Sequence, residues 1–295
     1  MNFFTRNRRP SFPPARRRTQ LVVISAISDG ELSGAEELLD SLSTYLDCSY
    51  EVIFADDATT DGAHERLLDL GCWVVRNPTK LHLSGLNLSL RRAIFEGYRL
   101  FDAPIFLKID PDALIIGHGL MDFVSRRFDS SPTAGLLGTF KLDWNGETRD
   151  LSYWREVMLR RKKDFNEVFD LAVRNGYEPG DGVQGGAYFF SRGCLSQIIR
   201  AGWLEGRGGY QPSINRFESI AEDSLFTMLV YASGYVAEDI GGPGQPFGLW
   251  DKGLPMPPEE LIRQGRLVTH ALKYRDEASL NARRYFRDLR YRARC

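Results

Sequence analysis

Two carboxylates one residue apart, in Asp110-Pro111-Asp112, are the side chains of this sequence best placed to do chemistry. They follow the apolar run 104–107, which predicts a buried strand. At the carboxyl end of a strand in an open α/β sheet, side chains face the crevice where ligands bind. Hard oxygen ligands at that place suit Mg²⁺ or Mn²⁺ bridging a phosphate, which points to a substrate carrying a diphosphate. Asp and Pro also favour turns, so the triplet alone leaves a plain turn as an open alternative.

The elements that would position these carboxylates alternate between strand and helix. Apolar runs predict strands at 21–26, 51–55, 72–75 and 104–109, and helical spacing predicts helices near 34–46, 64–70 and 88–100. This order is typical of a parallel sheet with crossover helices. We therefore predict an α/β fold with a mostly parallel central sheet flanked by helices. Neither a G-x-G-x-x-G after the first strand nor a P-loop motif is present, so neither nucleotide-binding fingerprint is supported.

The second half is less regular. The patterns there predict helices at 120–128, 153–175 and 222–233, strands at 135–140 and 185–191, and a Gly/Pro-rich loop at 241–258.

Composition limits the class of protein and the kinds of partner that the chain can have. The 295 residues are 43% hydrophobic and 26% charged, with a net charge of -1, so overall charge selects no polyanionic partner. Arginines nevertheless crowd both ends, and such runs can hold anionic lipid, nucleic acid or an acidic partner. A solvated tail or helix face is the competing interpretation. The first twenty residues contain three prolines and little periodicity, which predicts disorder.

The four cysteines show no paired or metal-knuckle spacing, which predicts free thiols in a reducing compartment. The apolar run 21–27 is too short to span a bilayer and lacks a signal-peptide layout. The sequence thus predicts a cytoplasmic protein without a transmembrane segment, with peripheral attachment at the membrane surface as an alternative.

The order of these motifs resembles the GT-A fold glycosyltransferases, in particular family 2, over about residues 20–275. The resemblance implies a disordered basic N-terminal tail at 1–20 and a GT-A domain at 21–275. Within that domain a nucleotide-binding half would occupy 21–115 and an acceptor-binding half 116–275. A basic C-terminal helix or tail would follow at 276–295.

Asp110-Pro111-Asp112 is similar to the D-x-D motif of that family. The resemblance implies that Asp112 binds the divalent metal, Mn²⁺ or Mg²⁺, and that Asp110 contacts ribose or metal-bound water. His270 lies where many GT-A enzymes have a histidine that completes the metal shell, and Lys273 where a basic residue lies near the diphosphate. A lone histidine is otherwise usually a packed or surface residue.

The stretch from Glu51 to Gly62 resembles the Asp-Asp-Gly-Ser-x-Asp-Gly segment of the family, with Ala58 in place of the usual glycine. There an acidic residue accepts hydrogen bonds from base or ribose, a role that falls on Asp56 or Asp57. In full, the resemblance implies nucleotide-binding roles for Ala26, Asp56, Asp57, Arg76, Asn87, Lys108, Asp110 and Lys273.

Glu222-Asp223 opens an apolar helix, and in the family an Asp at this place deprotonates the acceptor hydroxyl. The resemblance assigns that role to Asp223, with Glu222 beside it. Stabilisation of the helix N-terminus is the competing interpretation of this acidic pair. Gly185, Gly186 and Ala187 resemble the acceptor-side strand of the family, with a β-bulge as the alternative. Trp250 is a candidate for stacking on a sugar ring, or else a packing anchor.

The implied activity is metal-dependent transfer of a sugar from a nucleotide diphosphate sugar, with a UDP-sugar favoured, to an acceptor hydroxyl with inversion. The acceptor stays open between a glycan, a lipid-linked glycan and a nucleic acid held by the Arg-rich ends. The alternatives are a nucleotidyltransferase, or a non-catalytic carbohydrate- or nucleic-acid-binding module on the same fold.

Overall fold

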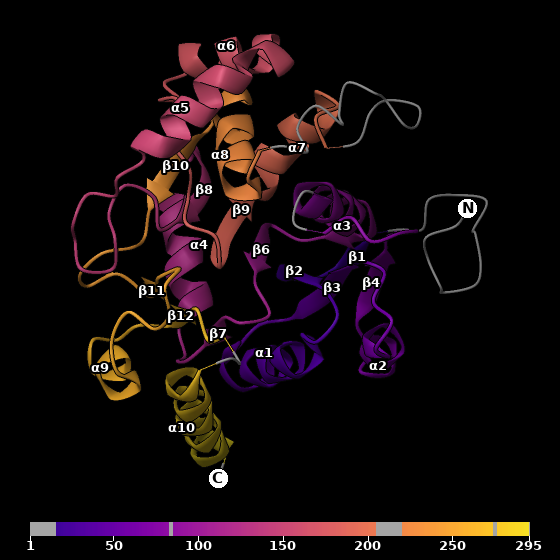
Figure 1. Cartoon of the computed structure of the whole chain (residues 1–295), viewed down its shortest axis with the longest axis vertical. Helices are drawn as coiled ribbons and strands as arrows, with labels where there is room; N and C mark the ends of the chain where they lie inside the picture. The colour runs from indigo at the N-terminus through magenta and orange to yellow at the C-terminus, as the bar shows by residue number, and fades with distance from the viewer. Residues whose placement is uncertain (1–15, 83–84, 205–219, 274–275, 295) are drawn as a thin grey trace.

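A seven-stranded sheet forms the centre of the protein, whose computed structural model describes residues 16–82, 85–204, 220–273 and 276–294 (Figure 1). The strand order is β10-β8-β9-β6-β2-β3-β4, and β9 runs antiparallel to both of its neighbours while the other pairs are parallel. The strands are β2 (Leu21–Ile27), β3 (Tyr50–Asp56), β4 (Trp73–Arg76), β6 (Ile105–Ile109), β8 (Ala134–Gly138), β9 (Ala187–Ser191) and β10 (Val236–Asp239). The predicted α/β fold with a mostly parallel sheet is confirmed.

Both faces of this sheet are covered. Strand residues alternate between them, so that Val22 and Ile24 of β2 belong to one apolar cluster and Leu21 and Val23 to the other. The first cluster includes residues of α3 (Leu86–Leu100), α6 (Asn166–Arg174), α7 (Arg192–Arg200) and α8 (Glu222–Ala232). The second includes residues of α1 (Leu32–Tyr45), α2 (Ala63–Asp69) and α4 (Leu120–Ser130). Coverage on both sides explains why the strands read as continuous apolar runs.

Two small sheets complete the framework. β12 (Val268–His270) lies between β11 (Phe247–Leu249), to which it is parallel, and β7 (Leu114–Ile115), to which it is antiparallel. Because β7 follows Asp112 within two residues, this pairing brings His270 to the end of β6 from far along the chain. β1 (Arg17–Arg18) pairs with β5 (Phe101–Asp102).

Two of the predicted elements in the second half are wrong in detail. The single helix at 153–175 is broken into α5 (Ser152–Arg161), a 3-10 turn at Lys162–Asp164, and α6. A straight helix of that length would run about 35 Å, whereas the turn lets α6 lie along α8, with Asn175 donating to the carbonyl of Tyr231. The loop at 241–258 contains β11, whose Phe247 and Leu249 are fully buried against β12.

Four of the C-terminal arginines pair with carboxylates of α1. Helix α10 (Glu277–Arg294) packs along α1, where Arg283 and Arg287 pair with Glu37, and Arg290 and Arg294 with Asp40. Four arginines thus share two carboxylates, and Arg283 and Arg290 are buried, while Arg287 and Arg294 remain about half exposed, so a basic surface persists at this end of the chain. Of the six N-terminal arginines, three lie in residues 1–15, outside the described residues, and Arg17 and Arg18 form β1 and pair with β5.

Cys48, Cys72 and Cys194 are free thiols as predicted, and Cys295 lies outside the described residues. None of the helices within the described ranges combines the length and apolar character needed to cross a membrane.

Candidate active site

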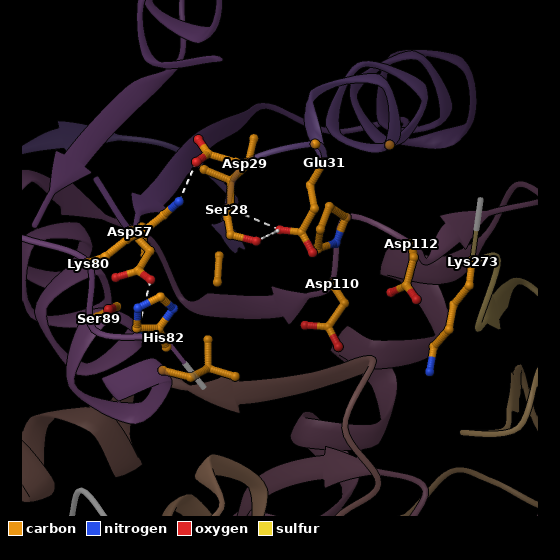
Figure 2. Close-up of a pocket in the computed structure, with 17 residues that line it drawn as sticks. Ser28, Asp29, Glu31, Asp57, Lys80, His82, Ser89, Asp110, Asp112 and Lys273 are labelled. Atoms are coloured by element: carbon orange, nitrogen blue, oxygen red, sulfur yellow. Dashed lines mark hydrogen bonds and ion pairs between the residues drawn. The ribbon is translucent and has the colours of Figure 1, made fainter. Parts of the chain in front are cut away.

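The carboxyl ends of β2, β3 and β6 border a cavity of about 860 Å³, a volume typical of small-molecule sites. Figure 2 shows that its walls come from loops distant in the sequence. Residues 28–31 follow β2, Asp57 follows β3, and Asp110 and Asp112 follow β6. Charged side chains from both halves of the chain therefore converge on one space.

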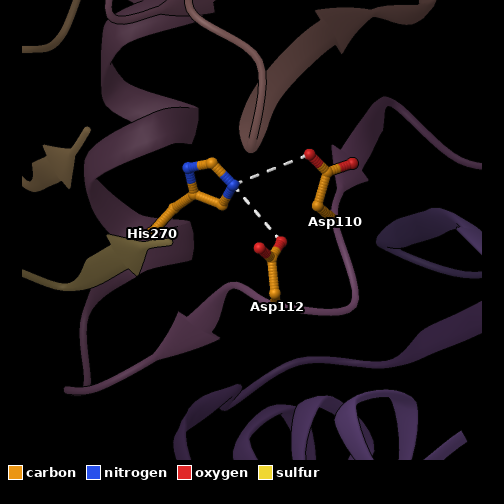
Figure 3. A group of neighbouring side chains, drawn as sticks. All are labelled: Asp110, Asp112 and His270. Carbon is orange, nitrogen blue, oxygen red and sulfur yellow. Dashed lines mark ion pairs between the residues drawn. The ribbon is translucent and has the colours of Figure 1, made fainter. Parts of the chain in front are cut away.

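At one end of this space, Asp110, Asp112 and His270 form a cluster whose potential ligand atoms all lie within 4.8 Å of one another (Figure 3). The His270 Nε2 atom is 3.2 Å from Asp112 Oδ1 and 3.8 Å from Asp110 Oδ2. Two carboxylates and an imidazole nitrogen aimed at one point require a proton or a cation between them. Carboxylate oxygen with imidazole nitrogen is a donor set that suits divalent metals such as Mn²⁺.

Backbone hydrogen bonds hold the three ligands in register. The amide of Asp110 donates to the carbonyl of Gly186 at 2.7 Å, and the amide of Leu272 donates to the carbonyl of Asp112 at 2.8 Å. The amide of Trp250 donates to the carbonyl of His270 at 2.8 Å. The cluster is thus built by the meeting of four chain segments, and none of them could form it alone.

The charges around Asp112 keep it ionised. Burial works against the charged form, but hydrogen bonding to His270 and the charges of His270, Lys273 and Arg283 lower the pKa of Asp112 below its ordinary value. Within the described part of the chain, His270 Nδ1 is buried and has no hydrogen-bond partner. An ionised Asp112 can bind a cation directly, whereas His270 must give up the proton on its Nε2 atom before that atom can act as a ligand.

Asp57 forms the opposite wall. Its carboxylate accepts hydrogen bonds from the backbone amides of Leu81 and His82 at 2.8 and 2.9 Å and from the side chain of Asn77. These bonds tie the loop after β4 to the end of β3, next to the predicted cavity residue Ala26. Asp57 is therefore the member of the Asp-Asp pair that lines the cavity.

Asp56 and Arg76, which were also expected beside a nucleotide, do not line this cavity. Asp56 is fully buried and accepts hydrogen bonds from His64, Arg76 and the amide of Thr59. Consecutive residues at the end of a strand point to opposite sides, so only one of Asp56 and Asp57 can reach the cavity. Asp56 and Arg76 instead brace the turn that carries Asp57.

Asn87 and Lys108 also lie outside the cavity lining. Asn87 is buried and donates to the carbonyl of Ile220 at 2.9 Å, just before α8. Lys108 is buried within β6, and its Nζ atom lies 2.8 Å from Asp110 and 3.1 Å from Glu222. The lysine therefore links the Asp110–Asp112–His270 cluster to the first residue of α8, because a buried ammonium requires paired carboxylates.

Asp223, next to Glu222, is the second chemically distinctive group. Burial and, next, the negative charge of Glu222 raise the pKa of Asp223 to about 7, against the opposing charges of Lys108 and Arg149. A carboxylate with a pKa near neutrality can take up a proton and release it under physiological conditions. Asp223 does not line the cavity of Figure 2, so it lies beside that space rather than in it.

The small residues before β9 lie between the two groups. A Cβ atom on Gly185 would lie 3.7 Å from Glu222 Oε1 and 3.9 Å from Asp223 Oδ2, while one on Gly186 would lie 2.6 Å from His270 Cγ. Ala187 is buried in β9. Trp250 is partly exposed and adjoins His270 through its backbone, so it lies on the side of the cluster near β12.

Replacing Gly186 by alanine is expected to disturb His270. Gly186 has a φ of 96°, which strains any residue with a side chain, and the new Cβ would clash with the imidazole. We expect the free energy of unfolding to fall by about 1–3 kcal/mol and Mn²⁺ affinity to fall about tenfold or more. Denaturant unfolding and Mn²⁺ titration measure the two effects.

Gly234→Ala is the matched control, because Gly234 has a φ of 83° and nothing within 4 Å of its added Cβ. It carries the same backbone strain without the clash. Equal Mn²⁺ affinity in the two variants would contradict the role assigned to Gly186.

The sequence analysis missed several side chains of the cavity. Ser28 donates from its amide and hydroxyl to Glu31, whose pKa is raised by burial, with the charges of Asp112 and Asp110 adding to the shift. Lys80 pairs with Asp29 across the cavity wall. The available signal was position: each follows a parallel strand, β2 or β4, at the edge where ligands bind.

No protein-family model matches this sequence, and no curated protein matches it. Among solved structures, a mannosyltransferase from Pyrobaculum calidifontis in complex with GDP-Man and Mn²⁺ is similar at 17% identity and a TM-score of 0.46, covering 92% of this chain and 62% of that one. S. aureus TarS 1-349 in complex with UDP is similar at 18% identity and a TM-score of 0.46, covering 75% of this chain and 58% of that one.

Glucosyl-3-phosphoglycerate synthase from Mycobacterium tuberculosis, in complex with phosphoglyceric acid, is similar at 17% identity and a TM-score of 0.42, covering 76% of this chain and 71% of that one. The chain thus spans less than two thirds of the length of the first two structures. At identities and TM-scores this low, substrate and activity follow only from this chain's own residues.

Proposed function

We propose that the protein is a metal-dependent glycosyltransferase that moves a sugar from a nucleotide diphosphate sugar to an acceptor hydroxyl. The observation that carries the proposal is the Asp110–Asp112–His270 cluster at the end of β6, on the wall of a cavity large enough for a nucleotide sugar. A carboxylate with a pKa of about 7, Asp223, lies on the neighbouring side of Gly185. A D-x-D-like pair followed by an acidic pair and a histidine is the motif order of the GT-A glycosyltransferases.

Asp110, Asp112 and His270 would hold the metal, Mn²⁺ or Mg²⁺. The mixture of carboxylate and imidazole ligands favours Mn²⁺ over Mg²⁺, which prefers oxygen ligands alone. When bound, such a metal stabilises the negative charge that develops on a departing diphosphate.

The nucleotide half would be held along the wall formed by β2 and β3. Asp57 offers carboxylate oxygens to base or ribose donors beside the apolar surface of Ala26, Ala55 and Leu86. Lys273 is exposed at the cavity, its ammonium group donates to the carbonyl of Asp251 at 3.4 Å, and its positive charge lowers the pKa of Asp112, so it could pair with a diphosphate bound there.

On the acceptor side, Asp223 would accept the proton of the acceptor hydroxyl as its oxygen attacks the anomeric carbon. The bond from that carbon to the diphosphate oxygen breaks as the new bond forms, and a single in-line displacement inverts the configuration. A pKa of about 7 suits this role, because a general base works best when its pKa is near the operating pH.

A binding experiment on the unmodified protein tests the proposal. Calorimetric titration with UDP, GDP, CDP and dTDP, each with Mn²⁺ and with EDTA, is expected to show binding of one nucleotide, UDP in our expectation, that depends on the metal. Absence of binding by every diphosphate in Mn²⁺, or binding that EDTA leaves unchanged, would contradict it.

A further inference from the structure

Arg283 on α10 is a buried cation outside the cavity lining, with 1% of its surface exposed. Its Nε atom donates to the carbonyl of Leu272 at 3.0 Å, and one terminal nitrogen donates to the same carbonyl. The other terminal nitrogen lies 2.7 Å from Glu37 of α1. One guanidinium therefore ties together α10, α1 and the segment that follows β12.

The segment held by Arg283, residues 270–273, contains two residues of the proposed active site, His270 and Lys273. Leu272 donates its amide to the carbonyl of Asp112, so its peptide groups are held by the metal-ligand loop on one side and by α10 on the other. His270 lies two residues before Leu272, and Lys273 follows it directly. The Leu272 side chain is fully buried in a cluster with residues of β7 and α10.

We propose that Arg283 is a positioning residue that fixes segment 270–273, and with it His270 and Lys273, relative to Asp112. The inference rests on the proposed function, since it assigns a purpose to the alignment of those groups. Arg283 is neither one of the residues that line the cavity nor one of the potential ligands.

The chemistry explains why this position carries arginine. A guanidinium presents donors in a planar fork and can serve a carbonyl and a carboxylate together, whereas the ammonium of lysine acts as a point charge. A buried cation is tolerated only where such partners are present. Because Arg283 bonds both Glu37 of α1 and the carbonyl of Leu272, the packing of α10 on α1 fixes the backbone of Leu272 next to Asp112.

Arg287 provides a matched control. It pairs with the same Glu37, through its own terminal nitrogen at 2.5 Å, but its side chain is 61% exposed. Arg283→Met and Arg287→Met each remove one cation from Glu37, and only the first removes the hydrogen bonds to the Leu272 carbonyl.

The test is Mn²⁺ titration of the two variants without nucleotide. We expect Arg283→Met to weaken Mn²⁺ binding about 10–100-fold, the range found when groups that orient metal ligands are removed. Arg287→Met should change it by less than about threefold, as for an exposed ion pair. Arg283→Lys retains the charge without the planar fork of donors, so its Mn²⁺ affinity should lie between those of Arg283→Met and Arg287→Met. If Arg283→Met does not fold, Arg283→Lys is the variant to compare with Arg287→Met.

Two further readouts separate positioning from general loss of stability. In metal-free protein, hydrogen exchange at the Leu272 amide should quicken in Arg283→Met relative to amides of the central sheet. Turnover by Arg283→Met should recover toward the wild-type value at saturating Mn²⁺, with the loss confined to the KM for Mn²⁺. Because Mn²⁺ binding to the native state would also rescue an unstable protein, circular dichroism must show that Arg283→Met is folded before Mn²⁺ is added.

Equal Mn²⁺ affinity in wild type, Arg283→Met and Arg287→Met would overturn this inference and leave the proposed function standing. A loss of turnover in Arg283→Met that saturating Mn²⁺ does not restore would also overturn it. Failure of the wild-type protein to bind Mn²⁺ at all would overturn the proposed function and this inference with it.

Discussion

Asp112→Ala is expected to abolish metal-dependent nucleotide binding. Asp112 supplies one of three converging ligands, and its carboxylate lies 3.2 Å from His270. A bound metal contributes several kcal/mol of charge stabilisation, so we expect turnover to fall by about a thousandfold or more at about 1.4 kcal/mol per tenfold. Calorimetry with UDP and Mn²⁺, followed by turnover assays with the donor so identified, measures both effects.

Two further variants make this test specific. Asp112→Asn keeps the shape and the backbone bond to Leu272 but removes the charge, so it should lose Mn²⁺ affinity while remaining folded. Asp129→Ala removes an exposed aspartate from α4 and should leave binding unchanged. If Asp112→Ala binds UDP with Mn²⁺ as the wild type does, the Asp-Pro-Asp segment is only a turn and the metal-dependent mechanism is refuted.

Asp223→Asn is expected to remove catalysis while leaving donor binding intact. The amide cannot accept the acceptor proton, and loss of a general base costs about 10²–10⁴-fold in turnover. Because Asp223 lies outside the cavity lining, the affinities for nucleotide and Mn²⁺ should stay near those of the wild type. Turnover assays beside calorimetry provide this separation, and parallel losses of binding and turnover would count against a role as base.

The role of Asp223 as a base also predicts how turnover depends on pH. Burial and the charge of Glu222 raise the pKa of Asp223 to about 7, so the base is protonated and inactive below that pH. Wild-type turnover should therefore fall about tenfold per pH unit below about 7, and residual turnover of Asp223→Asn should lack this limb. Glu222→Gln removes the neighbouring negative charge and should move the limb to lower pH. An acid limb near pH 4 in the wild type would refute the assignment.

Much of the fold follows from local patterns. The apolar runs of β2 and β6 are continuous because helices cover both faces of the sheet, and their alternation with amphipathic segments predicts parallel strands. The helix at 153–175 could not be divided correctly, because its break depends on packing against α8 rather than on a Gly or Pro in the sequence. β11 was missed since three residues in a Gly/Pro-rich stretch carry too little periodicity.

Some of the site residues can likewise be identified from the sequence, whereas the place of others depends on the folded structure. Asp110 and Asp112 are identifiable from the sequence because both lie in one short segment after a strand. Lys108 was expected beside a nucleotide, but its direction depends on Glu222 of α8, which only the folded chain brings within 3.1 Å. The sequence alone does not distinguish the roles of Asp56 and Asp57. In the folded protein Asp56 is buried beside His64, which leaves Asp57 to line the cavity.

By itself, then, the sequence determined the strand–helix order of the first half, the carboxylates at the end of β6 and the acidic start of α8, because each depends on residues close together in the chain. The tertiary structure decided which of those groups meet. β12 pairs with β7 and delivers His270 to Asp112, while Arg283 joins α10 and α1 to the same segment. Contacts between distant segments depend on the packing of whole elements, and no local pattern encodes that packing.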